Sequence, residues 1–362
     1  MKQKILHIID SFSKGGAEVL LAGVIPKLTD YEHVIIYLIP AKFPIAFFNS
    51  PDIKVECINF KGVFDSRRII KKLNTIINAE KPALIHTHLY FSSLFIRFAN
   101  IRDAKIIQTY HNEYYRIHYP QYIARLKNKC MKLIDRHTIK KSYTIIHVSK
   151  SQQKVNDFDL KINSSDVFYN YVNDVFYDPR KTLPFNNKNK LKIISVGNLK
   201  TEKNHILLLQ ALIKLKHLPI HVNICGEGND HVMLQQYINK YNLPVTILGS
   251  KNNIRELLDQ HDLFVSCAVI EGFGISVAEA MASKIPIIIS DISTFKEITE
   301  NKALFFESNN AHDLAEKIES FYLDPSIVAT HTLYCSTVAE KYRNSAFVEK
   351  LNQLYHSKIS VD

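Results

Sequence analysis

The sequence predicts an α/β protein built from two domains of similar design. Short apolar strands alternate with helical segments throughout, which is the pattern of parallel sheets whose strands are joined by crossover helices. The 362 residues are enough for two domains of ordinary size. A polar stretch at 178–189, with two prolines and three asparagines, interrupts the alternation, which then starts again. We therefore expect a linker there and a parallel sheet on either side of it.

Each expected strand is a short run of β-branched and other apolar residues, and helical spacing of three and four follows most of them. In the first half the expected strands lie at 4–10, 33–39, 54–60, 83–88, 104–110 and 143–149. In the second half they lie at 191–197, 221–228, 245–249, 262–268 and 285–290. The expected helices include 17–28, 121–141, 205–215, 253–260, 274–285, 311–323, 325–342 and 345–359.

The composition is that of a globular protein, with 46% hydrophobic and 22% charged residues. No apolar run reaches the roughly 18 residues that a membrane-spanning helix needs. The first ten residues lack the apolar region and cleavage site of a signal peptide. The five cysteines show no paired spacing, so neither a disulfide framework nor a zinc site follows from them. We expect a cytoplasmic protein.

The stretch 269–291 carries the strongest chemical signal. Glu271 and Glu279 stand on either side of a short loop, Gly272-Phe273-Gly274. Apolar spacing predicts that a helix begins near Gly274 and ends before Pro286. A loop that opens into a helix directs free backbone N–H groups towards an anion. Glu279 lies too far inside the helix to gain from the dipole, so we expect it to accept hydrogen bonds from hydroxyl groups.

Two further places in the first half attract attention. Gly15 and Gly16 follow the first strand, where backbone can approach a phosphate closely, but the third glycine of a dinucleotide fingerprint is missing. His86 and His88 lie on one face of a strand, so a metal pair is conceivable. The sequence indicates no third ligand, and we do not expect a metal. His111 follows the strand at 104–110.

The stretch 269–291 resembles the signature of retaining glycosyltransferases of family 4, which have the GT-B fold. The resemblance covers nearly the whole chain, although its specific motifs lie in 195–291. It implies two Rossmann-like domains that face each other across a cleft. We therefore expect an acceptor-side domain at 1–180, a donor domain at 181–340, and a last helix at 341–362 that packs back on the first domain.

The resemblance also implies roles for individual residues. Glu279 would hold the ribose of a nucleotide sugar and Glu271 would lie beside the transferred sugar. His111, Lys203 and Glu271 are the catalytic candidates. Backbone or side chains expected to hold the donor are those of Gly15, Gly16, Gly197, Asn198, Lys203, Gly226, Glu227, Phe273, Gly274 and Glu279. The resemblance implies a UDP-sugar more than a GDP-sugar, with no cofactor and no metal.

Two positions depart from the family pattern. Asn198 stands where arginine is common, so Lys203 would supply most of the charge that neutralises the diphosphate. Lys284 replaces a glycine before Ile285-Pro286. Because a lysine in a left-handed helix cap costs about 1 kcal/mol, we expect this helix end to be built differently.

The net charge of +11 belongs to the first half. Residues 1–165 carry 26 Lys and Arg against 13 Asp and Glu, and the remainder carries 20 against 22. The expected helix at 121–141 is basic, and an apolar set follows core-facing spacing: Ile123, Leu126, Cys130, Leu133, Ile134 and His137. A partner such as nucleic acid or an anionic membrane surface is one explanation for the charge, and solubility is the other. No nucleic-acid-binding motif is present.

The expected function is transfer of a sugar from a nucleotide diphosphate, with retention, to a lipid-linked or polysaccharide acceptor in surface glycan synthesis. A sugar-nucleotide epimerase or hydrolase on the same fold is an alternative. A binding subunit without turnover is another, because Asn198 replaces a charged residue. The sequence leaves the base, the sugar, the acceptor and the oligomeric state open.

Overall fold

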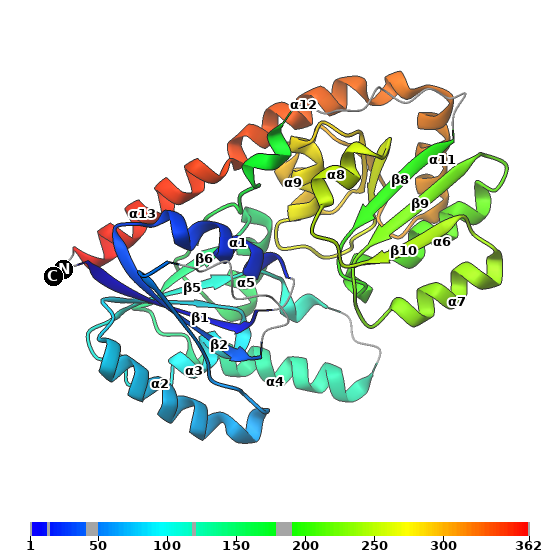
Figure 1. Cartoon of the computed structure of the whole chain (residues 1–362). Helices are drawn as coiled ribbons and strands as arrows, with labels where there is room; N and C mark the ends of the chain where they lie inside the picture. Colours follow the sequence, from blue (N-terminus) through cyan, green and yellow to red (C-terminus); the bar gives the residue numbers. More distant parts are fainter. Residues whose placement is uncertain (1, 13–14, 41–49, 118–120, 179–189, 361–362) are drawn as a thin grey trace. The chain divides into compact units, whose positions relative to one another are not determined.

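The computed structural model describes residues 2–12, 15–40, 50–117, 121–178 and 190–360 (Figure 1). The chain forms two compact units, one of residues 1–170 with 344–362 and one of residues 171–343. The change of unit therefore falls at Tyr171 and Asn344, whereas the sequence placed it at residues 181 and 341. Most of the expected linker, 179–189, lies outside the described residues.

The first unit contains a parallel sheet of seven strands in the order β3-β2-β1-β4-β5-β6-β7. The order reverses between β1 and β4, which pair directly, with His7 beside His86 and Ile9 beside His88. The strands are β1 (Gln3–Ser11), β2 (Tyr31–Ile39), β3 (Ile53–Cys57), β4 (Leu84–His88), β5 (Lys105–Tyr110), β6 (Thr144–His147) and β7 (Asp166–Val167).

Helices cover both faces of this sheet (Figure 1). On one face, α2 (Ser66–Glu80), α3 (Tyr90–Ile96) and α5 (Lys150–Leu160) bury aliphatic residues of β1, β2, β4 and β5. On the other face, α1 (Gly16–Val24) packs on Ile9, Ile35 and Tyr37. The last helix, α13 (Asn344–Ile359), contacts β4 on this second face and buries Leu351 and Tyr355.

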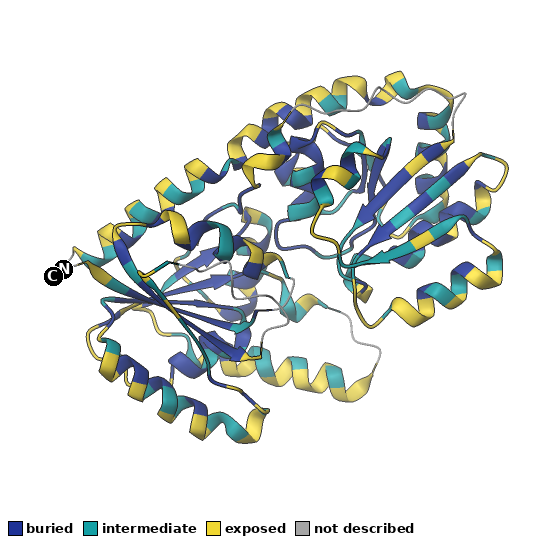
Figure 2. Cartoon of the chain, viewed as in Figure 1, coloured by how far each residue is buried: buried dark blue, intermediate teal, exposed yellow. Residues whose placement is uncertain are grey.

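The helix α4 (Tyr122–Thr138) does not pack as its spacing predicted. Asp135 is its one buried residue, while Ile123 is 80% exposed, and Figure 2 shows α4 almost entirely in the exposed and intermediate colours. Asp135 forms a buried ion pair with Arg97 at 2.6 Å and accepts hydrogen bonds from Tyr110 and Tyr115. The expected core-facing set was therefore wrong: α4 is anchored through a polar group, and its apolar residues Leu126, Leu133 and Ile134 are exposed.

The second unit repeats the design with a parallel sheet of six strands in the order β10-β9-β8-β11-β12-β13. The strands are β8 (Leu191–Val196), β9 (Ile220–Cys225), β10 (Val245–Gly249), β11 (Leu263–Ser266), β12 (Ile287–Ser290) and β13 (Leu304–Phe306). The helices are α6 (His205–Lys214), α7 (His231–Tyr241), α8 (Ile254–Asp259), α9 (Ile275–Ala282), α10 (Ser293–Ile298), α11 (Ala311–Leu323) and α12 (Ala329–Ala339). The predicted α/β class is confirmed in both units.

The end of α9 also differs from expectation. Lys284 keeps the left-handed conformation, with φ of 57°. The backbone N–H of Ile285 then donates to the carbonyl of Ala280 at 3.3 Å, and the N–H of Lys284 donates to Met281 at 3.0 Å. The helix is therefore closed in the manner typical of a glycine cap, although a lysine occupies the position.

None of the helices in the described ranges combines the length and the apolar character that crossing a bilayer requires.

Candidate active site

The second unit gathers most of the predicted donor-binding residues at one edge of its sheet. The strand order reverses between β8 and β11, and ligands of open α/β sheets bind at such a point, outside the carboxyl ends of the strands. The turn that contains Gly197 follows β8, and the loop that leads to Glu271 follows β11. Two segments far apart in sequence are therefore placed side by side by the topology.

The loop before α9 has a conformation that only glycine adopts easily. Gly274 has φ of 86°, and a β-carbon there would lie 2.7 Å from the ring of Phe295. The carbonyl of Glu271 accepts a hydrogen bond from Thr294 Oγ1 at 2.9 Å, and the ring of Phe273 meets that of Tyr342 edge-on at 5.1 Å. These contacts hold the loop, and α9 begins directly after Gly274, as predicted.

Lys203 and Glu271 form an ion pair between these two segments. Lys203 ends a short 3₁₀ turn, Thr201–Lys203, and Glu271 is buried at the entrance to the α9 loop. The backbone N–H of Val269 donates to the carbonyl of Glu202 at 2.9 Å, which ties the loop to the same turn. The sequence assigned separate roles to the two side chains, and the structure shows that each holds the other in place.

Within the described part of the chain, Glu279 on α9 has no cation or hydrogen-bond partner that would favour its charge. Burial raises the pKa of its carboxyl to about 8. At neutral pH the folded state holds a proton on this carboxyl group that the unfolded chain has released. This difference lowers the free energy of unfolding unless a ligand provides hydrogen bonds to the group. Its surroundings therefore suit a site that hydroxyl groups would complete.

The two glycine turns at this edge fit into each other. A β-carbon on Gly226 would lie 1.9 Å from the carbonyl oxygen of Gly197, and the backbone N–H of Leu199 donates to the carbonyl of Glu227 at 2.9 Å. Gly197 also lies against the aliphatic stem of Lys203. Gly226 is therefore required for close packing of the turns that carry Asn198 and Lys203.

His205 was missed by the sequence reasoning. It begins α6, is buried, and has its Nδ1 3.4 Å from Ser195 Oγ, while burial and the nearby Lys203 lower its pKa to about 4. Its Nε2 has no partner among the described residues. The signal that could have found it is its position, two residues after Lys203 at the start of a helix.

In the first unit, Gly15 caps the start of α1, as expected for a phosphate-facing turn. However, the carboxylate of Glu18 folds back over Gly15, where a β-carbon would lie 2.3 Å from Glu18 Oε2, and Ser11 donates a hydrogen bond to Glu18. Glu18 is 5% exposed. A diphosphate at the amides of Gly15 and Gly16 would therefore meet this carboxylate, which the sequence reasoning did not anticipate.

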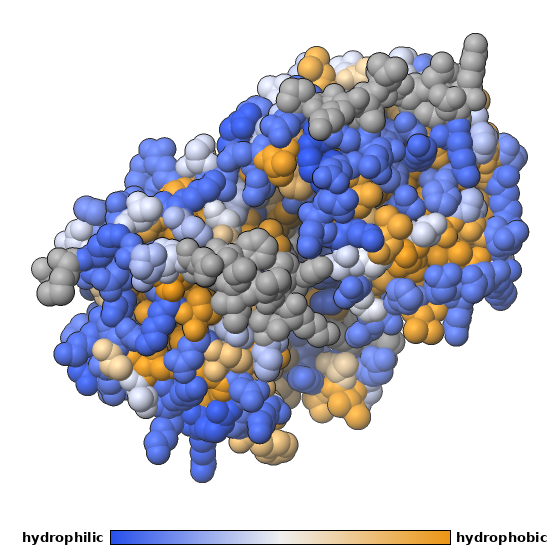
Figure 3. Space-filling view, viewed as in Figure 1, coloured by the Kyte–Doolittle hydropathy of each residue, from blue (hydrophilic) through white to orange (hydrophobic). Residues whose placement is uncertain are grey.

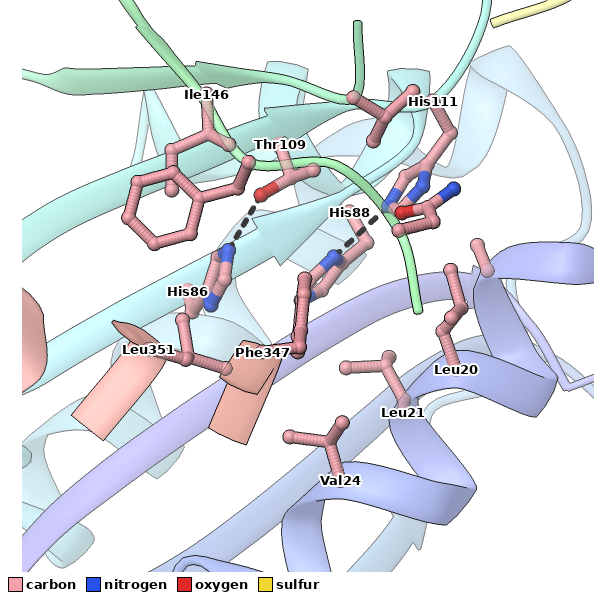
Figure 4. Close-up of a pocket in the computed structure, with 14 residues that line it drawn as sticks. Leu20, Leu21, Val24, His86, His88, Thr109, His111, Ile146, Phe347 and Leu351 are labelled. Carbon is pink, nitrogen blue, oxygen red and sulfur yellow. Dashed lines mark hydrogen bonds between the residues drawn. The ribbon is translucent and has the colours of Figure 1, made fainter. Parts of the chain in front are cut away.

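His111 follows β5 and meets a second histidine. Its Nε2 lies 3.1 Å from Nδ1 of His88, and burial lowers its pKa to about 4, so the ring is neutral at pH 7 (Figure 4). The half-buried Asp10, near the end of β1, accepts hydrogen bonds from the backbone of Phe91 and Ser92 at the start of α3. His111 is therefore held by a neighbour that the sequence had considered only as a metal ligand.

Comparison with known proteins decides the family. The model of glycosyl transferases group 1 matches residues 180–341, and that of glycosyltransferase family 4 matches residues 14–174. The chain is a GT-B glycosyltransferase of group 1, family 4. Together the two models cover most of the chain, one for each unit.

Relatives and solved structures agree with this assignment. An uncharacterised glycosyltransferase of Methanocaldococcus jannaschii is 26% identical over 84% of each chain. A poly(ribitol-phosphate) alpha-N-acetylglucosaminyltransferase of Staphylococcus aureus is 30% identical over 40% of this chain, a match that spans 31% of that protein. Sucrose-phosphate synthase from Thermosynechococcus elongatus superposes with a TM-score of 0.86 at 16% identity, over all of both chains. Anabaena HepE, solved with UDP and glucose, gives 0.80 at 19% identity over 99% of this chain and 100% of that one.

Proposed function

We propose that this glycosyltransferase transfers a hexose from a UDP-sugar, with retention at the anomeric carbon, to a lipid-linked or polysaccharide acceptor in surface glycan synthesis. The observation that carries the proposal is the joint placement of Lys203, Glu271, the α9 loop and Glu279 at one sheet edge. Anabaena HepE binds UDP and UDP-glucose, and the Staphylococcus aureus relative acts on a poly(ribitol-phosphate), which supports both halves of the proposal.

The proposed donor places each of its parts against a matching group. The diphosphate takes the cation Lys203 and the open N–H groups at the start of α9, where a helix end favours negative charge. The ribose hydroxyls donate to Glu279, which then gains the hydrogen bonds that stabilise its ionised form. The turn of Gly226 and Glu227 lies on the side of the ribose and base. This set requires no metal to balance the diphosphate charge.

The ion pair suggests how Lys203 and Glu271 divide the work. When the bond to the sugar breaks, negative charge accumulates on the leaving diphosphate, and a fixed cation at that place lowers the barrier. Glu271 is already balanced by Lys203, so it is poorly suited to attack the sugar and better suited to orient both the lysine and the sugar hydroxyls. The leaving diphosphate would then accept the acceptor's proton itself, on the face from which it departs.

The surface of α4 supports an acceptor at an anionic membrane. We define the α4 surface as the exposed apolar residues Phe98, Tyr122, Ile123, Leu126, Leu133 and Ile134. Figure 3 shows hydrophobic side chains over the first turns of α4. A groove of about 620 Å³ lined mainly by apolar residues of α2, α3 and α4 continues it. Exposed Arg125, Lys127 and Lys129 lie on the same helix, the combination of an interfacial helix. We place the enzyme on the cytoplasmic membrane face.

A thermal-shift screen with UDP-, GDP- and ADP-sugars tests the donor, because a bound ligand raises the unfolding temperature by mass action. NMR of the product made from the preferred donor then reports the anomeric configuration. An α-linked product from an α-linked donor supports retention, and a β-linked product refutes it. Free sugar or an epimer formed without acceptor would favour the hydrolase or epimerase, and donor binding without turnover in acceptor extracts would favour a binding subunit.

Vesicle sedimentation tests the membrane. The wild-type protein should pellet with anionic but not neutral vesicles, and less so at high salt. Ile123→Glu with Leu126→Glu should abolish pelleting. Val232→Glu with Met233→Glu, which alters two exposed apolar residues of α7, is the matched control and should leave it unchanged. Equal recovery with neutral and anionic vesicles would indicate an acceptor in solution.

A further inference from the structure

The first unit encloses a cluster of five histidines beneath α1 and α13. His7, His33, His86 and His88 are buried on β1, β2 and β4, and His111 follows β5. Figure 4 shows three of them, His86, His88 and His111. Because neighbouring residues of parallel strands point to the same face, the register that pairs β1 with β2 and β4 gathers these rings. Within the described residues, these rings hydrogen bond to one another, to hydroxyl groups and to one backbone carbonyl.

The carbonyl of Leu28 sets the proton positions at one end of this cluster. A carbonyl only accepts, so His33 Nε2, 2.9 Å away, carries a proton and donates it. A neutral His33 then accepts at Nδ1 from His7 Nε2, at 3.1 Å. His7 therefore carries its proton on Nε2, and its Nδ1 has a bare lone pair. Neither His7 Nδ1 nor His88 Nε2 has a partner among the described residues, although both are buried.

We propose that His7, His86 and His88 bind one divalent transition-metal ion, of which Zn²⁺ is the test case. One ring nitrogen of each lies within 4.8 Å of those of the other two. The structure thus adds His7 as a third ligand to His86 and His88, the pair that the sequence indicated. Nitrogen ligands of tetrahedral zinc, at about 2.0–2.1 Å from the metal, lie roughly 3.4 Å apart. The three rings therefore need to approach by at most about 1.4 Å.

The partners of the three rings are those that metal-bound histidines use. A ligating histidine almost always donates its other ring N–H to a fixed acceptor. His7 does so to His33, and His88 Nδ1 faces His111 Nε2. His86 lies 2.7 Å from Thr109 Oγ1 on one side and 2.6 Å from Tyr355 Oη on the other, so whichever nitrogen is not bound keeps a partner.

The surroundings of His86 and His88 leave space for a water molecule. A cavity of about 30 Å³ adjoins His86, His88 and His111 but not His7, and it has room for a single water. Its other walls are mostly apolar side chains, many of them from α1 and α13, with Thr109 and Asn170 as polar members (Figure 4). Imidazole ligands favour zinc, copper, nickel or iron over magnesium or calcium.

Metal binding would also determine the proton position on His111. With His88 Nε2 on the metal, its Nδ1 carries a proton and donates to His111 Nε2. His111 then keeps its own proton on Nδ1, the nitrogen directed away from His88. The ion would thus be a positioning element of the first unit and takes no part in binding the donor diphosphate.

Metal analysis of the full chain, made without a histidine tag and dialysed against metal-free buffer, tests the site. After addition of Zn²⁺ and removal of the excess, we expect about one zinc per chain and a raised unfolding temperature. Co²⁺ in its place should give the intense visible absorption of a tetrahedral site with nitrogen ligands. Absence of both, in folded wild-type protein, would overturn the proposal and leave a hydrogen-bonded histidine network that holds water.

Substitutions locate the ion. His88→Gln and His7→Gln should each lose the zinc and the cobalt spectrum, with circular dichroism to confirm folding. His205→Gln is the matched control, because His205 is also buried with an unpartnered Nε2 but lies in the second unit, and it should retain one zinc. Stoichiometric zinc in folded His88→Gln protein would show that the metal sits elsewhere and refute the assignment. If His7→Gln does not fold, the wild-type cobalt spectrum and His88→Gln still decide.

Discussion

Replacing Glu279 with glutamine should stabilise the enzyme and weaken donor binding at the same time. The pKa of Glu279 is raised from 4.5 to about 8 by burial. A folded-state pKa above the unfolded one means that the fold favours the protonated acid. Its contribution is therefore fully present below pH 4.5 and is lost as the pH rises towards 8. Glutamine is neutral throughout and escapes this loss.

The size of the effect follows from the shift. About 3.5 pH units at 1.36 kcal/mol each give an upper limit of about 5 kcal/mol. Because the Glu279 side chain is partly exposed, we halve this to about 2–3 kcal/mol. At pH 9 the Glu279→Gln protein should unfold roughly 5–10 °C above the wild type, and at pH 5 the two should be nearly equal. Glu316→Gln, on the exposed face of α11, should leave the unfolding temperature unchanged at both pH values.

Donor affinity should change in the opposite direction. Hydrogen bonds to a charged group contribute about 1.5–3 kcal/mol, and glutamine keeps one acceptor, so the dissociation constant for UDP should rise about tenfold. The loss for Glu279→Ala should reach the full range. Differential scanning calorimetry at the two pH values and calorimetric titration with UDP measure the two effects. A folded Glu279→Gln protein with wild-type UDP affinity would refute the ribose role, and equal stability gains at pH 5 and pH 9 would refute the raised pKa.

Three further predictions concern single residues, two in the second unit and one in the first. Lys203→Ala should lower kcat more than it raises KM, because the negative charge on the diphosphate grows towards the transition state. Lys203→Arg should restore part of the rate. A normal kcat for Lys203→Ala in steady-state kinetics would show that Lys203 does not contact the diphosphate. Gly274→Ala should destabilise the second unit by more than about 1–2 kcal/mol in urea unfolding, since strain adds to the clash with Phe295; an unchanged midpoint would contradict this. Asp135→Ala should cost about 3–5 kcal/mol by leaving Arg97 buried without a counter-charge, and a loss below 1 kcal/mol would show that the pair is dispensable.

The sequence predicted what local chemistry decides. The glycine-rich loop and the helix start at Gly274 were correct because no other residue suits that backbone. The alternation of strands and helices predicted two parallel sheets for the same reason, since each element carries its own periodicity. The expectation that the helix end at Lys284 would be built differently was wrong, because Lys284 adopts the left-handed conformation and the usual closing hydrogen bonds form.

What the sequence could not show depends on contacts between distant segments. The spacing on α4 showed an apolar face but did not show whether another element covers it. In the structure α4 buries Asp135 instead, and the apolar residues predicted to face the core are exposed or partly exposed. The pairing of β1 with β4 brings His7 to His86 across 79 positions, a relation that no local pattern contains. The ion pair of Lys203 with Glu271 likewise depends on which strands the sheet places next to each other.

The assignment of α13 to the first unit has a consequence for the order in which the protein is made. Residues 344–362 leave the ribosome after the second unit, yet Tyr355 and Leu351 belong to the interior of the first unit, whose other residues leave before it. Domains fold as units during synthesis, so the second unit can close its core while the first still exposes the histidine face of its sheet. The first unit therefore lacks α13, and stays incomplete, until the entire second unit has been translated. A chain that stops before Asn344 would never bury that face, and it would be a substrate for chaperones or proteases.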